Sequence, residues 1–293
     1  MKSLLRIGLI GKVTALEAIR HRVLNVLLVF ALLVMGSAYF LSQLSFDQQI
    51  QFIKDFSFGA MTLVGVIMAI VAVAQLVPNE IENRTLFTIL AKPIRRTEFL
   101  IGKFFGISLV LVVMLGIMAS VFGIVLGLRE KTFERQITTA MQETTSLETK
   151  ADAQETLEKV RAEVRDPYLI MALVLIYGRW LLVAAIALLI STFATSTFFT
   201  VVTTTLIYIL GHLQGTAREI WLQSSIQIGW LPKTILMLVS LFIPDFQSLT
   251  SLDAIVVGTA PSWGHLFFVL GYIGVYLVIV MGVASLIFSN REW

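Results

Sequence analysis

The sequence lacks cysteine and is poor in charged residues. None of its 293 residues is cysteine, which excludes disulfide scaffolds, thiolate metal sites and cysteine nucleophiles together. Only 14% of the residues are charged and 57% are hydrophobic, with a mean hydropathy of +0.87, whereas soluble domains have about 25% charged residues. So large an apolar excess cannot be buried in one water-soluble core. The composition therefore predicts a protein whose solvent is the lipid bilayer.

The motifs of common active sites are missing as well. The histidines His21, His212 and His265 are far apart, none stands in an HExxH pattern, and no GxSxG sequence occurs. The Gly11–Lys12 and Gly102–Lys103 pairs lack the earlier glycine and the following Ser or Thr of a phosphate-binding loop. We expect a non-catalytic chain that carries no metal or cofactor. A net charge of only +3 does not suggest nucleic-acid binding.

Long apolar segments make up most of the chain, and a helix needs about 20 apolar residues to cross about 30 Å of hydrocarbon. The segments are residues 23–43, 57–77, 104–128, 168–193, 198–213 and 266–288. The fifth is short and rich in threonine, and it can span if residues 191–197 extend its start. A run at 235–243 is too short to cross, which predicts a re-entrant or interfacial helix. The predicted fold is an all-α polytopic membrane protein with six transmembrane helices.

Lysine and arginine lie mostly on one side of this topology. With the N-terminus inside, the inner side holds most of the basic residues outside the 129–167 loop. We therefore expect a multi-pass protein of the inner (cytoplasmic) membrane with both termini in the cytoplasm. Residues 1–22 combine apolar residues at near-helical spacing with Lys2, Arg6 and Lys12, which predicts an amphipathic helix in contact with lipid at the inner membrane surface. The alternative is a plain cytoplasmic tail.

Residues 129–167 form the one long hydrophilic segment and predict an extracytoplasmic helical hairpin. Two apolar stripes at helical spacing would close on each other. They consist of Phe133, Ile137 and Met141 in the first helix, and Leu157, Val160 and Val164 in the second. Because a two-helix hairpin buries little by itself, one hypothesis is that these residues dock a neighbouring subunit or an extracytoplasmic protein. The alternative is a hairpin that needs no partner.

Arg179 is the one charged residue near the middle of a predicted span, where a charge is costly unless it faces the bundle, a partner or water. It could contact an anionic or polar substrate in a cavity. Alternatively it is structural, donating to backbone carbonyls or reaching the membrane surface. The glycine pairs Gly102/Gly106 and Gly123/Gly127 permit close helix contact.

The segment between the second and third predicted spans begins as a capped helix. Asn79 is a predicted N-cap with Glu82 as its partner three residues on, and Lys92–Pro93 ends the helix. The expected element is a short helix over 79–91, lying crosswise under the membrane and followed by a basic turn. The positive-inside rule explains the basic residues of that turn. The capped helix itself suggests a rigid knob for a groove in another protein.

This segment, "NEIENRTLFTILAKPIRRTEFLIGK", resembles the stretch after the second span in ABC type-2 exporter permeases. The matching residues are Glu80, Glu82, Thr85, Leu86, Leu90, Pro93, Arg96, Glu98, Gly102 and Lys103. The stretch "ALEAIRHR" is similar to the elbow helix of that family. Within the family, "FIPDFQSLTSLD" looks most like permeases associated with multicopper-enzyme maturation. The 129–167 hairpin is longer than the usual connection there, so a substrate cannot be carried over.

The resemblance implies a permease subunit of an ATP-driven exporter, paired with a second permease copy or homologue and with a separate ABC ATPase that holds ATP and Mg. Residues 79–91 would then be the coupling helix. The implied ATPase contacts are Asn79, Glu80, Glu82, Arg84, Thr85, Leu86, Leu90, Pro93 and Arg96. A second hypothesis is a membrane scaffold that transmits ATPase movement through the hairpin to an extracytoplasmic protein, without transport. A membrane enzyme is disfavoured, since polar residues do not converge within the spans.

Overall fold

The computed structural model of the chain is built of helices. It describes residues 2–44, 49–76, 95–143, 147–194, 196–223, 243–247, 249, 255–256 and 262–290. The helices are α1 (Lys2–Ile19), α2 (Arg22–Leu41), the 3-10 turn η1 (Ser42–Leu44), α3 (Gln49–Leu76), α6 (Arg96–Glu143), α7 (Leu147–Val164), α8 (Tyr168–Ser191), α9 (Thr197–Gln223) and α12 (Trp263–Asn290). No strand occurs within these described ranges, so the predicted all-α class is confirmed.

Six helices in the described part of the chain are long and apolar enough to cross a membrane, namely α2, α3, α6, α8, α9 and α12. Their outward side chains include Leu33, Phe40, Phe268 and Val278, each at least 69% exposed. Large apolar surface of this kind is stable only when lipid covers it. The chain is a multi-pass membrane protein. Its α9 continues to Gln223, ten residues beyond the predicted end of the fifth span at residue 213.

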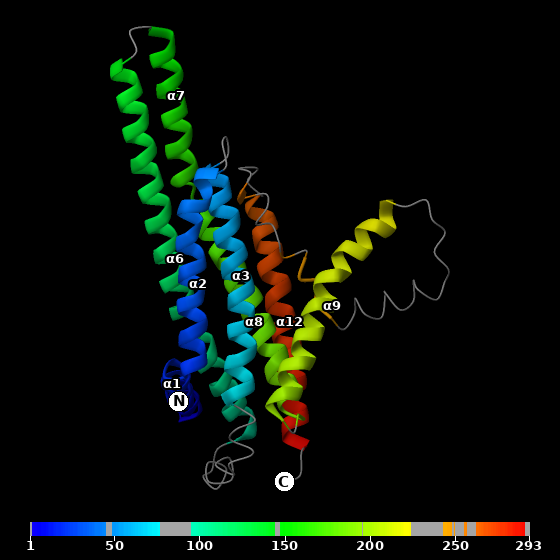
Figure 1. The fold of residues 1–293 in the computed structure, drawn as a ribbon. Helices are drawn as coiled ribbons and strands as arrows, with labels where there is room; N and C mark the ends of the chain where they lie inside the picture. The colour runs from blue at the N-terminus through cyan, green and yellow to red at the C-terminus, as the bar shows by residue number, and fades with distance from the viewer. Residues whose placement is uncertain are drawn as a thin grey trace.

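Three helix ends lie together at one end of the bundle. The start of α1, the start of α6 and the end of α12 lie together there, and the hairpin of α6 and α7 projects from the opposite end (Figure 1). Helix α9 leans away from the other spans along part of its length (Figure 1). Because the start of α1 and the end of α12 lie at the same end of the bundle, the chain between them crosses the membrane an even number of times.

Helix α6 is the longest element and joins the bundle to the hairpin without a break. It has 48 residues, which corresponds to roughly 72 Å at 1.5 Å per residue, more than twice the hydrocarbon thickness of about 30 Å. The third predicted span, residues 104–128, and the first predicted hairpin helix are therefore one rod. No proline lies between Arg96 and Glu143 to interrupt it.

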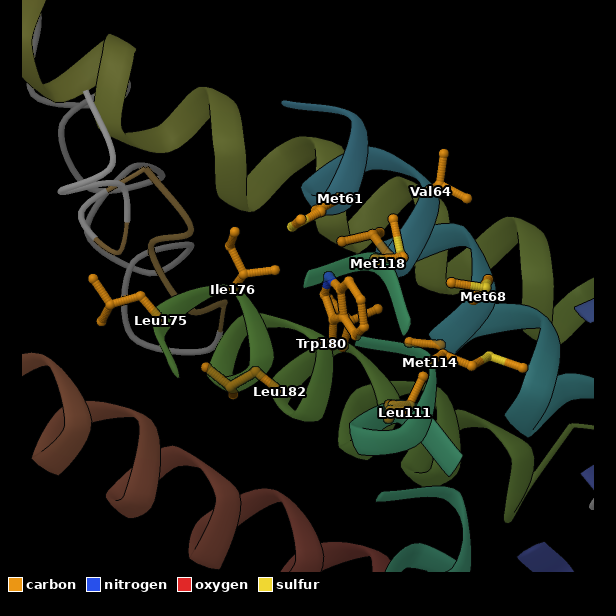
Figure 2. Packing of buried hydrophobic residues seen from close by; sticks show 14 of the residues in the cluster. Met61, Val64, Met68, Leu111, Met114, Met118, Leu175, Ile176, Trp180 and Leu182 are labelled. Carbon is orange, nitrogen blue, oxygen red and sulfur yellow. The ribbon is translucent and has the colours of Figure 1, made fainter. Parts of the chain in front are cut away.

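Helix α8 is the centre of the bundle. It packs against α3, α6, α9 and α12, and apart from Arg179 it is apolar on all faces and mostly buried from Leu175 to Ser191, as expected of a helix surrounded by protein. Its Trp180 is fully buried among methionines of α3 and α6 (Figure 2). Gly65 of α3 makes room for the ring, because a Cβ at Gly65 would overlap the Trp180 indole.

Candidate functional site

Helix α1 packs on the start of α6 through glycines. A Cβ on Gly106 of α6 would lie 2.5 Å from the carbonyl oxygen of Gly11, and one on Gly11 would lie 3.2 Å from the carbonyl oxygen of Gly102. Only residues without a side chain allow two helix backbones to approach so closely. The other glycine pair of α6, Gly123 and Gly127, has open space at both Cβ positions. The two similar motifs of one helix therefore have different environments.

Polar contacts accompany the glycine contact. The Ser3 hydroxyl donates to Oε1 of Glu98 at 2.7 Å, and Nη1 of Arg6 lies 3.7 Å from Oε2 of the same carboxylate. Nζ of Lys103 lies 4.0 Å from Oε2 of Glu17. Glu98 and Lys103 are buried, whereas the side chains of their partners Arg6 and Glu17 are 39% and 51% exposed. These contacts orient α1 on the first turns of α6.

The opposite face of α1 is apolar and open. Leu5, Leu9, Val13 and Leu16, whose spacing predicts membrane contact, are between 48% and 66% exposed. The face turned to α6 carries the small residues. Helix α1 therefore has one face for protein and one that lipid can cover. It packs along α6 instead of forming a loose tail.

Arg96 connects the start of α6 to the end of α12. Its Nη1 donates to the carbonyl oxygen of Ser289 at 3.0 Å and, more weakly, to that of Phe288 at 3.4 Å. A cation is stabilised at a helix C-terminus, where unpaired carbonyls carry partial negative charge. Of the residues expected to contact an ATPase, Arg96 alone is described. The others, from Asn79 to Pro93, and the predicted helix at 79–91 lie outside the described residues, as do residues 235–242 of the predicted short helix.

A cavity of about 420 Å³ lies between α3, α8 and α9. Its wall is mainly apolar along α3, and Arg179 of α8 contributes the central charge. Asp55 of α3 and His212 of α9 line it where these helices approach the hairpin end. Small-molecule sites of proteins have this size and this mixture of apolar wall and few polar groups.

Arg179 is 3% exposed. Its Nη2 donates to the carbonyl oxygen of Phe246 at 3.0 Å. The Phe246 amide donates to the carbonyl oxygen of Gly211, and the Asp245 amide donates to the Tyr272 hydroxyl. Arg179 thus contacts the "IPDFQ" stretch, residues 243–247, which also contacts α9 and α12. The two alternatives for Arg179 are compatible, because the residue has the predicted backbone hydrogen bond and also lines a cavity.

The hairpin is held by ion pairs between α6 and α7. Nη2 of Arg161 lies 2.7 Å from Oε1 of Glu134, and Nη2 of Arg165 lies 3.3 Å from Oε1 of Glu130. Exposed pairs of this kind contribute at most about 1 kcal/mol each. Their main effect is therefore to set the register of α7 against α6, and they contribute little to stability.

The hairpin residues predicted to dock another protein are mostly buried or half-buried within the chain itself. Val160 is 8% exposed, and the half-buried Phe133 and Val164 pack against the main core. Ile137 and Leu157 are also half-buried, and Met141 lies on α6 but its side chain is outside the described part. Docking of another protein by these residues stays a prediction.

The helices and contacts define a multi-pass helical membrane protein with polar contacts at the α1–α6–α12 end, in the hairpin and around one intramembrane arginine. The family model of the ABC-2 family transporter proteins matches residues 12–293. The chain belongs to this family, and it is therefore a membrane permease subunit of an ABC transporter, a subunit that is generally non-catalytic and works with an ABC ATPase. No curated protein matches the chain. The multicopper-maturation subgroup stays a prediction.

Sequence reasoning missed several residues that the structure brings together. Ser3, Gly11 and Glu17 meet α6, and Thr62 and Tyr208 line the cavity with Arg179. The GxxxG pair Gly102/Gly106 was the available signal for the first group. For the cavity the one sequence signal was Arg179; Thr62 and Tyr208 carry none, because the cavity is formed by residues of three separate helices.

Proposed function

We propose that this chain couples ATP hydrolysis on a separate ABC ATPase to the export of a substrate across the membrane. Family membership supports the permease role. The observation that supports coupling is the fixed start of α6, which follows the 79–91 segment along the chain. It is joined to α1 by glycine contacts and ion pairs, and to the end of α12 by Arg96.

A force applied just before Arg96 would therefore reach three helices at once. Close-packed contacts transmit displacement, because they shift between discrete arrangements and do not deform continuously. An ATPase that binds one arrangement more tightly than the other would change the population of the two states. The inner-membrane location, the cytoplasmic termini and a dimer with a second permease copy or homologue belong to the same proposal.

The test is charge reversal in the proposed coupling helix. Glu80→Lys or Glu82→Lys should reduce co-purification of the ATPase and its stimulated hydrolysis, while membrane insertion stays normal. Glu158→Lys makes the same charge change on an exposed position of α7, at the other end of the molecule, and should have no effect. If neither reversal alters co-purification or hydrolysis, the coupling role of 79–91 is wrong.

A second candidate function is supported by the continuity of α6. This helix runs from the proposed coupling end to the hairpin, so movement of one end would move the other. In that case the chain would transmit work to an extracytoplasmic protein without transport. Deletion of residues 129–167 separates the two functions. Transport in vesicles that survives the deletion, with loss of partner binding, would reject the pure transmission function.

A further inference from the structure

The cavity between α3, α8 and α9 has a charged centre. Arg179 lies 11 residues after Tyr168, the first residue of α8, which places it roughly 17 Å along the helix axis, near the middle of about 30 Å of hydrocarbon. A guanidinium keeps its charge at any physiological pH. Its bond to the carbonyl of Phe246 fixes its position on the cavity wall. An anionic group is the ligand that such a wall favours.

Thr62 places a second polar group at the wall of the same cavity. The Thr62 hydroxyl is buried and has no hydrogen-bond partner among the described residues, and Thr62 lines the cavity with Arg179. A buried hydroxyl without a partner destabilises the folded state. A ligand oxygen beside Arg179 would accept from this hydroxyl and remove that cost.

The rest of the wall on α3 is suited to a hydrocarbon chain. Phe58, Leu63, Ile67 and Ile70 line the cavity, and Leu63 and Ile67 are 61% and 39% exposed on the side that lipid covers. The cavity is thus open towards the bilayer. Asp55, at the hairpin end of the cavity, disfavours a second anion there.

We propose that this cavity binds a single-chain amphiphile with an anionic head, taken from the bilayer, with its head at Arg179 and Thr62 and its tail along α3. The inference deepens the proposed export function, on which it rests, by naming the substrate class. The charge, the hydroxyl without a partner and the apolar opening to lipid all favour the same ligand.

The experiment uses the full chain in nanodiscs of zwitterionic lipid, without an ATPase. The probes are a photoreactive palmitic acid and the matched photoreactive fatty alcohol and fatty amine, and labelled residues are mapped by mass spectrometry. We expect the acid to label the walls of the cavity about tenfold more than either analogue, which corresponds to about 1.4 kcal/mol. Equal labelling by acid and alcohol, or stronger labelling by the amine, would overturn the proposal.

Variants locate the binding. Arg179→Gln should lower labelling by the acid about tenfold, and Arg179→Lys should retain part of it. Because Arg179 also holds Phe246, a second variant leaves that contact intact. Gly59 lines the cavity with open space at its Cβ, so Gly59→Leu should fill the cavity and abolish labelling. Gly271→Leu is the control, since Gly271 on α12 also has open space at its Cβ.

The alternative occupant that the experiment must distinguish is a second copy of the chain, packed over the cavity. Since the chain has no cysteine, a Leu63→Cys variant forms a disulfide only with another copy. A disulfide-linked pair without labelling by the acid would overturn the amphiphile site. Labelling that persists in Gly59→Leu would do the same. These outcomes are independent of the ATPase assays with Glu80→Lys and Glu82→Lys, so the two proposals fail separately.

Discussion

Gly106 of α6 and Gly11 of α1 are in backbone contact: a Cβ on Gly106 would lie 2.5 Å from the Gly11 carbonyl oxygen. This contact attaches the N-terminal helix to the start of the long helix α6. Gly106 lies 15 residues after residue 91, the end of the segment proposed to meet the ATPase. If the start of α6 moves as proposed, α1 should move with it.

Gly106→Ala should separate α1 from α6. The added methyl cannot fit beside a backbone oxygen, and overpacking of this kind costs about 1–3 kcal/mol. Thermal unfolding of the purified chain in detergent should show a lowered midpoint. ATPase stimulation should fall as well, because α1 would no longer move with α6.

The matched control is Gly123→Ala on the same helix. Gly123 belongs to the second GxxxG pair and has open space around its Cβ, so the alanine should be neutral or slightly stabilising through higher helix propensity. Equal unfolding midpoints for the two variants would contradict the assigned role of the first pair.

Arg96→Gln should weaken the junction between α6 and α12. The variant loses the positive charge at the C-terminal carbonyls of α12, an interaction of about 0.3–1 kcal/mol. We expect a small fall in the unfolding midpoint and a larger fall in stimulated ATP hydrolysis. Arg135→Gln removes a charge from an exposed position on the same helix and should change neither. A normal ATPase response in Arg96→Gln would show that this junction is not needed for coupling.

Gly65→Ala should destabilise the bundle because its methyl would overlap the Trp180 indole, with a cost of about 1–3 kcal/mol. Trp180→Ala should cost about 3–5 kcal/mol through the cavity it leaves. In the double variant the Gly65→Ala substitution should cost little further, since the overlapping ring is gone. Unfolding by SDS in mixed micelles measures the three free energies. If the two single costs simply add in the double variant, the methyl at residue 65 does not overlap the Trp180 ring and the assigned contact is wrong.

Lys131→Pro should bend α6 between the membrane and the hairpin. Proline in a helix interior removes a backbone hydrogen bond and costs about 3 kcal/mol or more. If the chain exports a substrate, transport in vesicles should persist, since the span before residue 131 is unchanged. Lys131→Ala, at the same exposed position, controls for loss of the charge. Loss of transport in the proline variant alone, with ATPase binding intact, would show that export requires an unbent α6.

Part of the site could be predicted from the sequence, where the signal is local. The Arg179 position follows from one charged residue in an apolar run, and its bond to a backbone carbonyl was one of the two alternatives considered. The rest of the cavity wall could not be predicted, because Thr62 and Tyr208 come from helices whose rotation relative to Arg179 the sequence does not specify. The same holds for Arg96, whose partner carbonyls lie 192 and 193 residues further along the chain.

The sequence by itself determined the solvent, the helical class and six apolar helices able to cross a membrane, because hydrocarbon forces every backbone group in a span to bond within its own helix. Only the tertiary structure decided which faces of these helices meet. It distinguished Gly106, against a backbone oxygen, from Gly123, beside open space, although the two motifs have the same spacing. Without a hydrophobic driving force between helices in lipid, close packing selects the contacts, and packing depends on all helices at once.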